Sequence, residues 1–436
     1  MEPAPFQKGD NQMYSNISEE LLQFIHKSPD CFHAVHTMEE MLEEEGYVEL
    51  KENLKWEIQR GGKYFVNRNG SSLIAFTIPE GEMKGMRIIA SHSDSPTFKI
   101  KENPEMESEG HYIKLNVERY GGMLCAPWFD RPLSISGRVI VKDSSTGTFV
   151  SKLVNIDRDL VMIPNLAIHM NREVNDGYKY NAQKDMLPIY GDITSKGTFM
   201  KTVAEAAGVE ESDILGHDLF LYNRQEGTVW GASGEFLSSS RLDDLQCAFS
   251  SLKALLAGEK KEYMAVHCVL DNEEVGSGTK QGAASTFLYD TLTRVHESLG
   301  MTREEYLIHL ADSFMISADN AHAVHPNYAD KADPVNRPFL NGGIVIKFNA
   351  NQKYCTDGVS AAMFRDVCRQ ADVPVQTFTN RSDMLGGSTL GNISNTQVAL
   401  NTVDIGLPQL AMHSPYETVG VKDTEYLIRA GIKFFS

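Results

Sequence analysis

Residues 263–276 have the sequence YMAVHCVLDNEEVG, in which a mostly apolar run ends in a cluster of polar side chains. A run of eight such residues is typical of a buried strand. The run is followed by the adjacent carboxylates Glu273 and Glu274. Two such charges repel each other, and burying them costs free energy unless cations compensate them. Metal hydrolases give such a pair two tasks, because one carboxylate ligates the metal and its neighbour activates water. The alternative is an acidic turn exposed to solvent.

The same pattern of an apolar strand leading to polar residues recurs along the chain, with helical patterns between several of the strands. One helical pattern covers residues 241–256, with Gly258 as its C-cap. This alternation predicts an α/β fold, a mixed twisted sheet flanked by helices, whose functional residues gather beyond the carboxyl ends of the strands. The other strands are residues 86–90 before His92, 314–318 before Asp319, 343–348, and 399–405 leading towards His413.

The remaining chain predicts two opening helices, a hairpin and an insertion. Apolar residues at helical spacing precede Gly46, and residues 56–78 alternate around two glycine turns. Residues 97–234 contain many turns between short β-branched runs, which indicates a β-rich insertion that splits the α/β domain. The expected domains are therefore a catalytic domain in two parts, 1–96 and 235–436, and an insertion domain, 97–234.

Bulk composition is that of a soluble globular protein of about two domains. The 436 residues are 42% hydrophobic and carry a formal net charge of -18, which disfavours binding to nucleic acid and to anionic membranes. The six cysteines form no CxxC pair, so free cysteines are expected. Residues 1–16 are polar, with no apolar run for a signal peptide or an anchor. A cytoplasmic location is the default expectation.

Four further segments offer candidate metal ligands. His92 follows an apolar strand, and Asp94 is placed to accept the other ring proton. Asp243 begins a predicted helix, where Asp is also a routine N-cap. Asp319 ends another strand, and His413 follows a last one. Each could also be an ordinary loop residue, and His322 and His325 beside Asp319 could equally be loop histidines or support other ligands.

Together these residues are more informative than each is alone. One His, one Asp, a Glu-Glu pair, one Asp and one His occur in that order. They supply oxygen and nitrogen ligands that suit zinc, with cobalt or manganese as alternatives. Two metals that share one carboxylate form a common hydrolytic site.

The chain resembles the M18 metallopeptidases, the aspartyl aminopeptidase family. The matching motifs occur in the order of the family and run through most of the chain. One departure is Asp244, where many relatives have Asn. The motifs are SHSDSP at 91–96, WFDR at 128–131, RLD at 241–243, DNEEVG at 271–276, SAD at 317–319, HPNY at 325–328 and AMHS at 411–414.

The resemblance implies a dinuclear-metal aminopeptidase and a role for each matching residue. Asp243 would bridge two divalent metal ions, and the peptide bond between Asp243 and Asp244 would be cis. Glu273 would be the general base, and Asp94 would support His92. Of the remaining ligands, His92 and Asp319 would complete one metal site, and Glu274 and His413 the other.

The resemblance also implies an assembly and a substrate preference. The β-rich insertion would serve oligomerisation into a tetrahedral homo-dodecamer, in which His169 reaches the active site of a partner subunit. Lys347 interrupts a buried strand, where a lysine is costly unless an anion meets it. In the family the matching lysine contacts an acidic first residue of the peptide substrate. The alternatives are that Lys347 pairs with an internal carboxylate or extends its ammonium group to solvent. Gly387 and Ser388 are expected to form another wall of the pocket.

Several other functions remain open. A broad-specificity or neutral-residue aminopeptidase would use the same metal site without an acidic preference. A carboxypeptidase or deacylase would need a cation for a substrate carboxylate terminus. A non-catalytic assembly protein would have lost a ligand or the base, and none is missing. A dinuclear phosphoesterase usually has more histidines and an arginine near the metals.

Overall fold

The computed structural model describes residues 8–436, and the expectation of a polar N-terminus lies partly outside them, at residues 1–7. The chain forms two compact units. The first contains Met1–Asp94, Gly227–Met412 and Glu417–Ser436, and the second contains Ser95–Glu226 and His413–Tyr416. Each unit has its own sheet and its own hydrophobic core.

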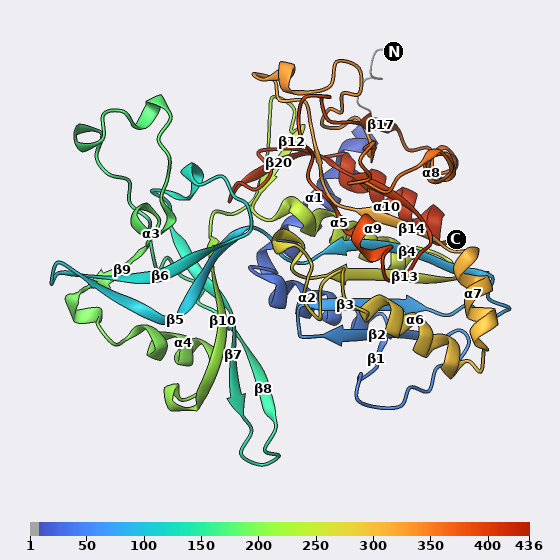
Figure 1. The fold of residues 1–436 in the computed structure, drawn as a ribbon, viewed down its shortest axis with the longest axis horizontal. Helices are drawn as coiled ribbons and strands as arrows, with labels where there is room; N and C mark the ends of the chain where they lie inside the picture. The colour runs from blue at the N-terminus through green and yellow to red at the C-terminus, as the bar shows by residue number, and fades with distance from the viewer. Residues whose placement is uncertain (1–7) are drawn as a thin grey trace. The chain divides into compact units, whose positions relative to one another are not determined.

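The first unit is built on a nine-stranded mixed sheet with the order β1-β2-β3-β13-β4-β14-β18-β16-β17 (Figure 1). Its central strands β13, β4, β14 and β18 are parallel to one another, while β3 and β16 pair antiparallel with their inner neighbours. The strands are β1 Val48–Glu49, β2 Lys63–Arg68, β3 Ser72–Thr77, β4 Gly85–His92, β13 Tyr263–Leu270, β14 Phe314–Ala318, β16 Ile344–Lys347, β17 Val375–Phe378 and β18 Asn401–Gly406.

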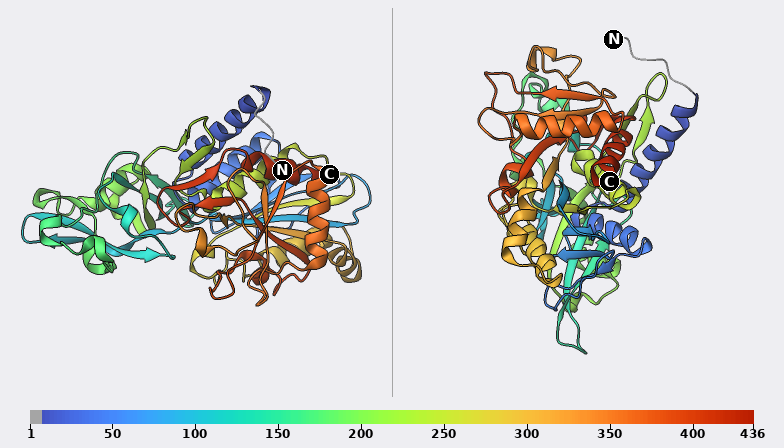
Figure 2. Two further views of the ribbon diagram at one scale, coloured as in Figure 1. Left: turned by 90° about the horizontal axis from the view of Figure 1, so that it is seen from above. Right: turned by 90° about the vertical axis from the view of Figure 1, so that its right-hand side faces the viewer.

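Helices cover both faces of this sheet (Figure 2). Alternate side chains of β4 point to opposite faces, so Ile89 packs in one core while Ile88 and Ala90 pack in the other. The first core takes residues from α1 Lys8–Lys27, α2 Cys31–Glu44, α5 Leu242–Ala257, α8 Gly358–Gln370 and α10 Asp423–Phe435. The second takes residues from α6 Phe287–Ser298, α7 Arg303–Ala311 and α9 Leu390–Ser394.

The register of the central strands brings their carboxyl ends to one edge. Leu270 of β13 lies opposite His92 of β4, and Ser317 of β14 lies opposite Ala90 of β4. The residues that follow β13 and β14 in sequence therefore leave the sheet beside His92. This is the edge at which α/β sheets place their functional residues.

The first unit also contains a smaller sheet of five strands, and some of these strands adjoin the candidate site residues in sequence. Its order is β11-β12-β20-β19-β15. The segment that follows Asp319 enters this sheet through β15, which pairs with β19. Its strands are β11 Thr228–Trp230, β12 Phe236–Ser239, β15 Ala321–His322, β19 Pro408–Leu410 and β20 Glu417–Gly420.

The second unit contains an antiparallel sheet of six strands, in the order β8-β7-β10-β5-β6-β9. Its core includes Phe98, Trp128 and Phe199, which are all buried. The elements are β5 Thr97–Ser108, β6 Tyr112–Tyr120, β7 Leu133–Lys142, β8 Phe149–Asn155, β9 Ile189–Asp192 and β10 Ile214–Asn223, with α3 Ala182–Asp185 and α4 Phe199–Ala207.

The structure confirms the mixed α/β fold and each of the five predicted strands that lead to polar residues. Gly46 and Gly258 lie where the predicted helices end. All six cysteines are free, and four of them are buried. None of the helices in residues 8–436 is long and apolar enough to cross a membrane.

Candidate metal centre

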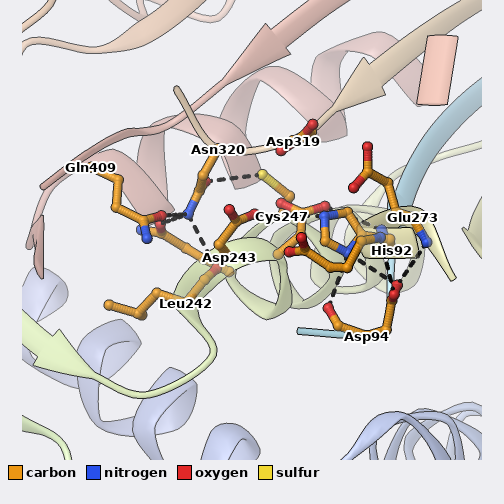
Figure 3. A network of polar contacts seen from close by, with 12 residues as sticks. His92, Asp94, Leu242, Asp243, Cys247, Glu273, Asp319, Asn320 and Gln409 are labelled. Atoms are coloured by element: carbon orange, nitrogen blue, oxygen red, sulfur yellow. Dashed lines mark hydrogen bonds and ion pairs between the residues drawn. The ribbon is translucent and has the colours of Figure 1, made fainter. Parts of the chain in front are cut away.

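His92, the last residue of β4, is buried, and Asp94 supports it in two ways. The Nδ1 atom of His92 lies 3.0 Å from the main-chain oxygen of Asp94 and 3.4 Å from the Asp94 Oδ1 atom. The two oxygens of the Asp94 carboxylate also accept the backbone N–H groups of Glu273 and Glu274, at 3.1 and 3.2 Å. Asp94 therefore connects the end of β4 to the acidic turn after β13, in addition to the expected contact with the ring (Figure 3).

Asp243 and Asp244 lie at the start of α5, both buried and outside helical backbone geometry. Arg241, with φ 56°, is the N-cap residue and makes no side-chain capping bond, so Asp243 is not the routine cap that its position allowed. The peptide bond between Asp243 and Asp244 is cis, as expected. Glu417 accepts the backbone N–H of Asp243 at 3.0 Å, and Asp244 Oδ2 accepts that of His92 at 3.1 Å.

Asp319 completes a compact group at this edge of the sheet. One ligand atom from each of His92, Asp243, Asp244 and Asp319 can be chosen so that all four lie within 4.8 Å of one another. His92 Nε2 lies 3.5 Å from Asp243 Oδ1. On the other side of Asp319, Lys347 Nζ lies 3.7 Å from the Oδ2 atom. The alternative considered for Lys347, an internal carboxylate partner, is therefore present.

Glu273 and Glu274 form a 3-10 turn with Val275, and two residues separate this turn from the end of β13. Ligand atoms of His92, Glu273 and Glu274 also lie within 4.8 Å of one another. The pKa of Glu273 is raised to about 8, and burial is the largest cause. The charge of His92 opposes the shift, while the charges of Asp319, Asp94 and Asp243 add to it. Burial and the charge of Asp243 raise the pKa of Glu274 well above its ordinary value.

The donor set fits a divalent cation. Burial, followed by the charges of Asp319 and Asp243, raises the pKa of Asp244 well above its ordinary value, although His92 opposes the shift. One oxygen of Asp244, Oδ1, is buried and accepts no hydrogen bond from the described residues. Several carboxylates this close repel one another in a buried site, and a cation removes that cost. Imidazole nitrogen and carboxylate oxygen are ligands that zinc accepts.

Four of the other predicted site residues lie in loops or turns. His413 follows Met412, the last residue of that segment of the first unit, and is grouped with the second unit, so its ligation remains a prediction. His169 is exposed in a 3-10 turn of the second unit. Gly387 is exposed, and the Ser388 hydroxyl contacts Asn392 Oδ1 at 2.9 Å. These roles stay predictions.

His322 and His325, which could have been ligands, belong to none of the ligand groups found among the described residues. Both are exposed. The His322 ring packs near that of Phe378, at 6.0 Å between centroids, and His325 Nδ1 accepts the backbone N–H of Asn327. Of the three candidates in this stretch, only Asp319 joins the cluster.

The polar residues that hold the ligands in place were not predicted from the sequence. These are Asn320, Gln246, Gln409, Cys247 and Glu417, all buried. Asn320 is the centre of a hydrogen-bond network beside the cluster (Figure 3). The only sequence signal for a role of Asn320 was its position directly after Asp319, because the residues that it hydrogen-bonds are distant in sequence.

A buried imidazole–carboxylate cluster at the carboxyl ends of parallel strands, on an α/β fold, defines a metal-dependent hydrolase. A sequence model of the family described as "Aminopeptidase I zinc metalloprotease (M18)" matches residues 24–435. A "Probable M18 family aminopeptidase 2" of Clostridium acetobutylicum is 50% identical over 426 residues, which cover 96% of this chain and 98% of that protein. The chain belongs to the M18 family, and it is a metal-dependent aminopeptidase that hydrolyses peptide bonds.

Solved structures agree with this assignment. The structure described as "Cryo-EM structure of the Ape4 and Nbr1 complex" is similar with a TM-score of 0.95 and 34% identity, covering 99% of this chain and 87% of that one. The "Structure of S. cerevesiae mApe1 dodecamer" is similar with a TM-score of 0.85 and 29% identity, covering 97% of both chains.

Proposed function

We propose that the chain is an aminopeptidase with two divalent metal ions, most simply zinc, bound at His92, Asp243, Glu274, Asp319 and His413. Asp243 would be shared between the ions, with His92 and Asp319 completing one site and Glu274 and His413 the other. The observation that carries the proposal is the convergence of ligand atoms of His92, Asp243 and Asp319 within 4.8 Å in a buried group. Its support comes from the chemistry of these donors and from the zinc family to which the chain belongs.

Glu273 is proposed as the general base. Bound divalent ions supply Lewis acidity, which makes water acidic near neutral pH and polarises a peptide carbonyl. The Glu273 carboxylate takes the proton of the attacking water and returns it to the leaving amine. A carboxylate in this position can both accept and donate a proton during the reaction. Asp94 holds the turn on which Glu273 lies through the backbone N–H of that residue.

Lys347 is proposed to favour substrates with an acidic first residue. Burial lowers the pKa of its ammonium group, but the charges of Asp319 and Asp404 raise that pKa by more, so Lys347 stays charged. A charged donor in a buried site makes a strong contact with a carboxylate. Gly387 and Ser388 are proposed to form part of the same pocket.

A second candidate, a broad-specificity or neutral-residue aminopeptidase, has one observation in its favour. Lys347 Nζ already lies 3.7 Å from Asp319, so part of its charge is compensated inside the protein. A substrate carboxylate would then gain less from this lysine than it would from an unpaired one. The two candidates differ only in substrate preference.

The β-rich segment 97–234 is proposed to serve assembly into a homo-dodecamer in the cytoplasm. A related yeast protein, mApe1, is described as a dodecamer. In such an assembly His169 would reach the active site of a partner subunit. Its segment supports a contact role, because Leu166, Ile168 and Met170 expose 56%, 48% and 72% of their surface.

Kinetics on a panel of aminoacyl reporter substrates, with defined metals added back to metal-free protein, test the function. We expect zinc, cobalt or manganese to restore cleavage of unblocked aminoacyl substrates and Asp or Glu substrates to give the highest kcat/KM. Equal values for Leu or Ala substrates would favour the broad-specificity candidate. Cleavage of N-acylated or carboxy-terminal substrates instead would show a deacylase or carboxypeptidase.

A further inference from the structure

Asn320 connects three segments of the first unit through one side-chain amide. Its Nδ2 atom, which carries two hydrogens, faces three acceptors: the main-chain oxygen of Leu242 at 3.1 Å, Gln246 Oε1 at 3.1 Å and Gln409 Oε1 at 2.6 Å, so two of the acceptors share one hydrogen. Its Oδ1 atom accepts the thiol of Cys247 at 3.3 Å. These residues are between 0% and 2% exposed, so the network is closed to solvent (Figure 3).

The position of this network relates it to two proposed metal ligands. Asn320 directly follows Asp319, and the Leu242 oxygen that it binds belongs to the residue directly before Asp243. One side chain therefore spans the gap between the backbones that carry the two carboxylates, which lie 76 residues apart in the chain.

Both sides of this bridge are held by further hydrogen bonds. On one side, the backbone N–H groups of Asp319 and Ala321 donate to Ile405 and Leu407 at 3.1 and 2.8 Å. On the other side, the backbone N–H of Asp243 donates to Glu417. Each segment is therefore fixed within the sheets, and the bond between Asn320 and Leu242 joins the two segments directly beside the carboxylates.

The chemistry of the network requires an amide at position 320. Three acceptors surround Nδ2 and one donor faces Oδ1, and only Asn places a donor and an acceptor in these two directions at this size. An aspartate would set a buried carboxylate against three acceptors. An apolar residue would leave those acceptors unsatisfied, which costs roughly 1–3 kcal/mol for each buried group.

We propose that Asn320 is a positioning residue that sets the separation of Asp243 and Asp319 and thereby the affinity of the site for a divalent ion. The inference rests on the metal site of the proposed function. Residues that orient metal ligands without touching the metal typically change metal affinity or activity by about 10–100-fold when replaced.

The test measures how zinc distributes between the full-length protein and a chromophoric chelator, alongside the Tm of the metal-free protein. Asn320→Asp, which is nearly isosteric, should weaken zinc binding by about 10–100-fold. Ser317→Ala is the matched control, because Ser317 lies on the preceding strand and its buried hydroxyl has no hydrogen-bond partner among the described residues. It should keep wild-type affinity.

A second pair of variants applies if Asn320→Asp does not fold. Cys247→Ala removes the donor to Asn320 Oδ1, together with the contact between the thiol and Asp244, and should weaken zinc binding, while Cys247→Ser keeps a donor and should restore it. Unchanged zinc affinity in Asn320→Asp, or in Cys247→Ala when Asn320→Asp is unfolded, overturns the inference, even if Tm falls. Failure of the wild-type protein to bind zinc, cobalt or manganese would instead overturn the proposed function.

Discussion

Buried charge is the main feature of the site at the level of single residues. Asp243, Asp244 and Asp319 are each at most 8% exposed, and their ligand atoms surround His92. Burial lowers the pKa of His92, but hydrogen bonding to Asp243 and Asp94 and the charge of Asp244 raise it well above its ordinary value. A group of this kind is arranged to hold a cation, and each residue in it has a testable role.

Glu273→Gln should remove nearly all turnover and leave metal binding intact. Glu273 is assigned as base and not as ligand, and loss of a general base typically costs about 10²–10⁴-fold in rate. Steady-state kinetics and metal analysis of the same preparation check this. Glu262→Gln, at an exposed residue that pairs with Lys84, is the control and should match wild type. A Glu273→Gln enzyme with near-normal kcat would exclude the assignment.

Lys347→Met should reduce the preference for acidic first residues. The ratio of kcat/KM for Asp or Glu substrates to that for Leu or Ala substrates measures this, and it should fall by about 10-fold or more if a charge-assisted contact is lost. Because Lys347 also contacts Asp319, zinc affinity should be measured in the same variant. Lys433→Met, at an exposed lysine of α10, is the control. An unchanged ratio would show that Lys347 serves only Asp319.

At the level of elements, helix α5 presents its first turn to the cluster without a side-chain cap. Arg241 adopts a left-handed conformation, and its guanidinium donates to the main-chain oxygens of Ile25, in the last turn of α1, and of Ser28, directly after α1. The start of α5 is therefore held by the end of α1. Three of the other proposed ligands, His92, Glu274 and Asp319, lie at or just after the carboxyl ends of β4, β13 and β14.

The exposed turn Ile168–Met170 is the element of the second unit with the clearest test. If its histidine reaches a partner subunit's active site, His169→Ala should lower kcat by about 10²-fold, as loss of a transition-state donor does, with subunit folding unchanged. Kinetics, circular dichroism and light scattering check this. His111→Ala, another exposed histidine of this unit, is the control. Unchanged assembly together with unchanged kcat would rule the role out.

At the level of the whole molecule, the metal should govern how stability depends on pH. Burial raises the pKa of Glu273 to about 8 and that of Asp271 to about 7. A carboxyl group whose pKa is raised by folding binds its proton more tightly in the folded state. Its stabilising effect is complete below the unfolded pKa, near 4, and is lost as pH rises through the folded value.

The Tm of metal-free protein should therefore fall between pH 5 and pH 8. Zinc should raise Tm at both values, and more at pH 8, because its ligands bind in their deprotonated form. At about 100 times its Kd, zinc adds roughly 2.7 kcal/mol. Thermal unfolding followed by circular dichroism checks this, and Glu273→Gln should reduce the slope. A metal-free Tm that is constant or rises over this range contradicts the prediction.

Much of the fold and of the candidate site could be predicted from the sequence by itself. The apolar run 263–270 and its four counterparts identify strands because burial on both faces requires continuous apolar residues. The polar residue after each strand identifies a candidate, because carboxyl ends gather at one edge of an α/β sheet. The family motifs added a proposed role for each of these residues, and those roles stay predictions.

Only the tertiary structure decided which of these candidates meet and what holds them. The sequence left open whether His322 and His325 join Asp319 as ligands, but the chain enters the pairing of β15 with β19 directly after Asn320, and neither histidine belongs to the ligand groups found among the described residues. The contact between Lys347 and Asp319, and the bond from Asn320 to Leu242, join elements that no local pattern connects. Periodicity reports which face of an element is buried. Hydrogen bonds between distant elements depend on strand order and register, which form only when the whole sheet assembles.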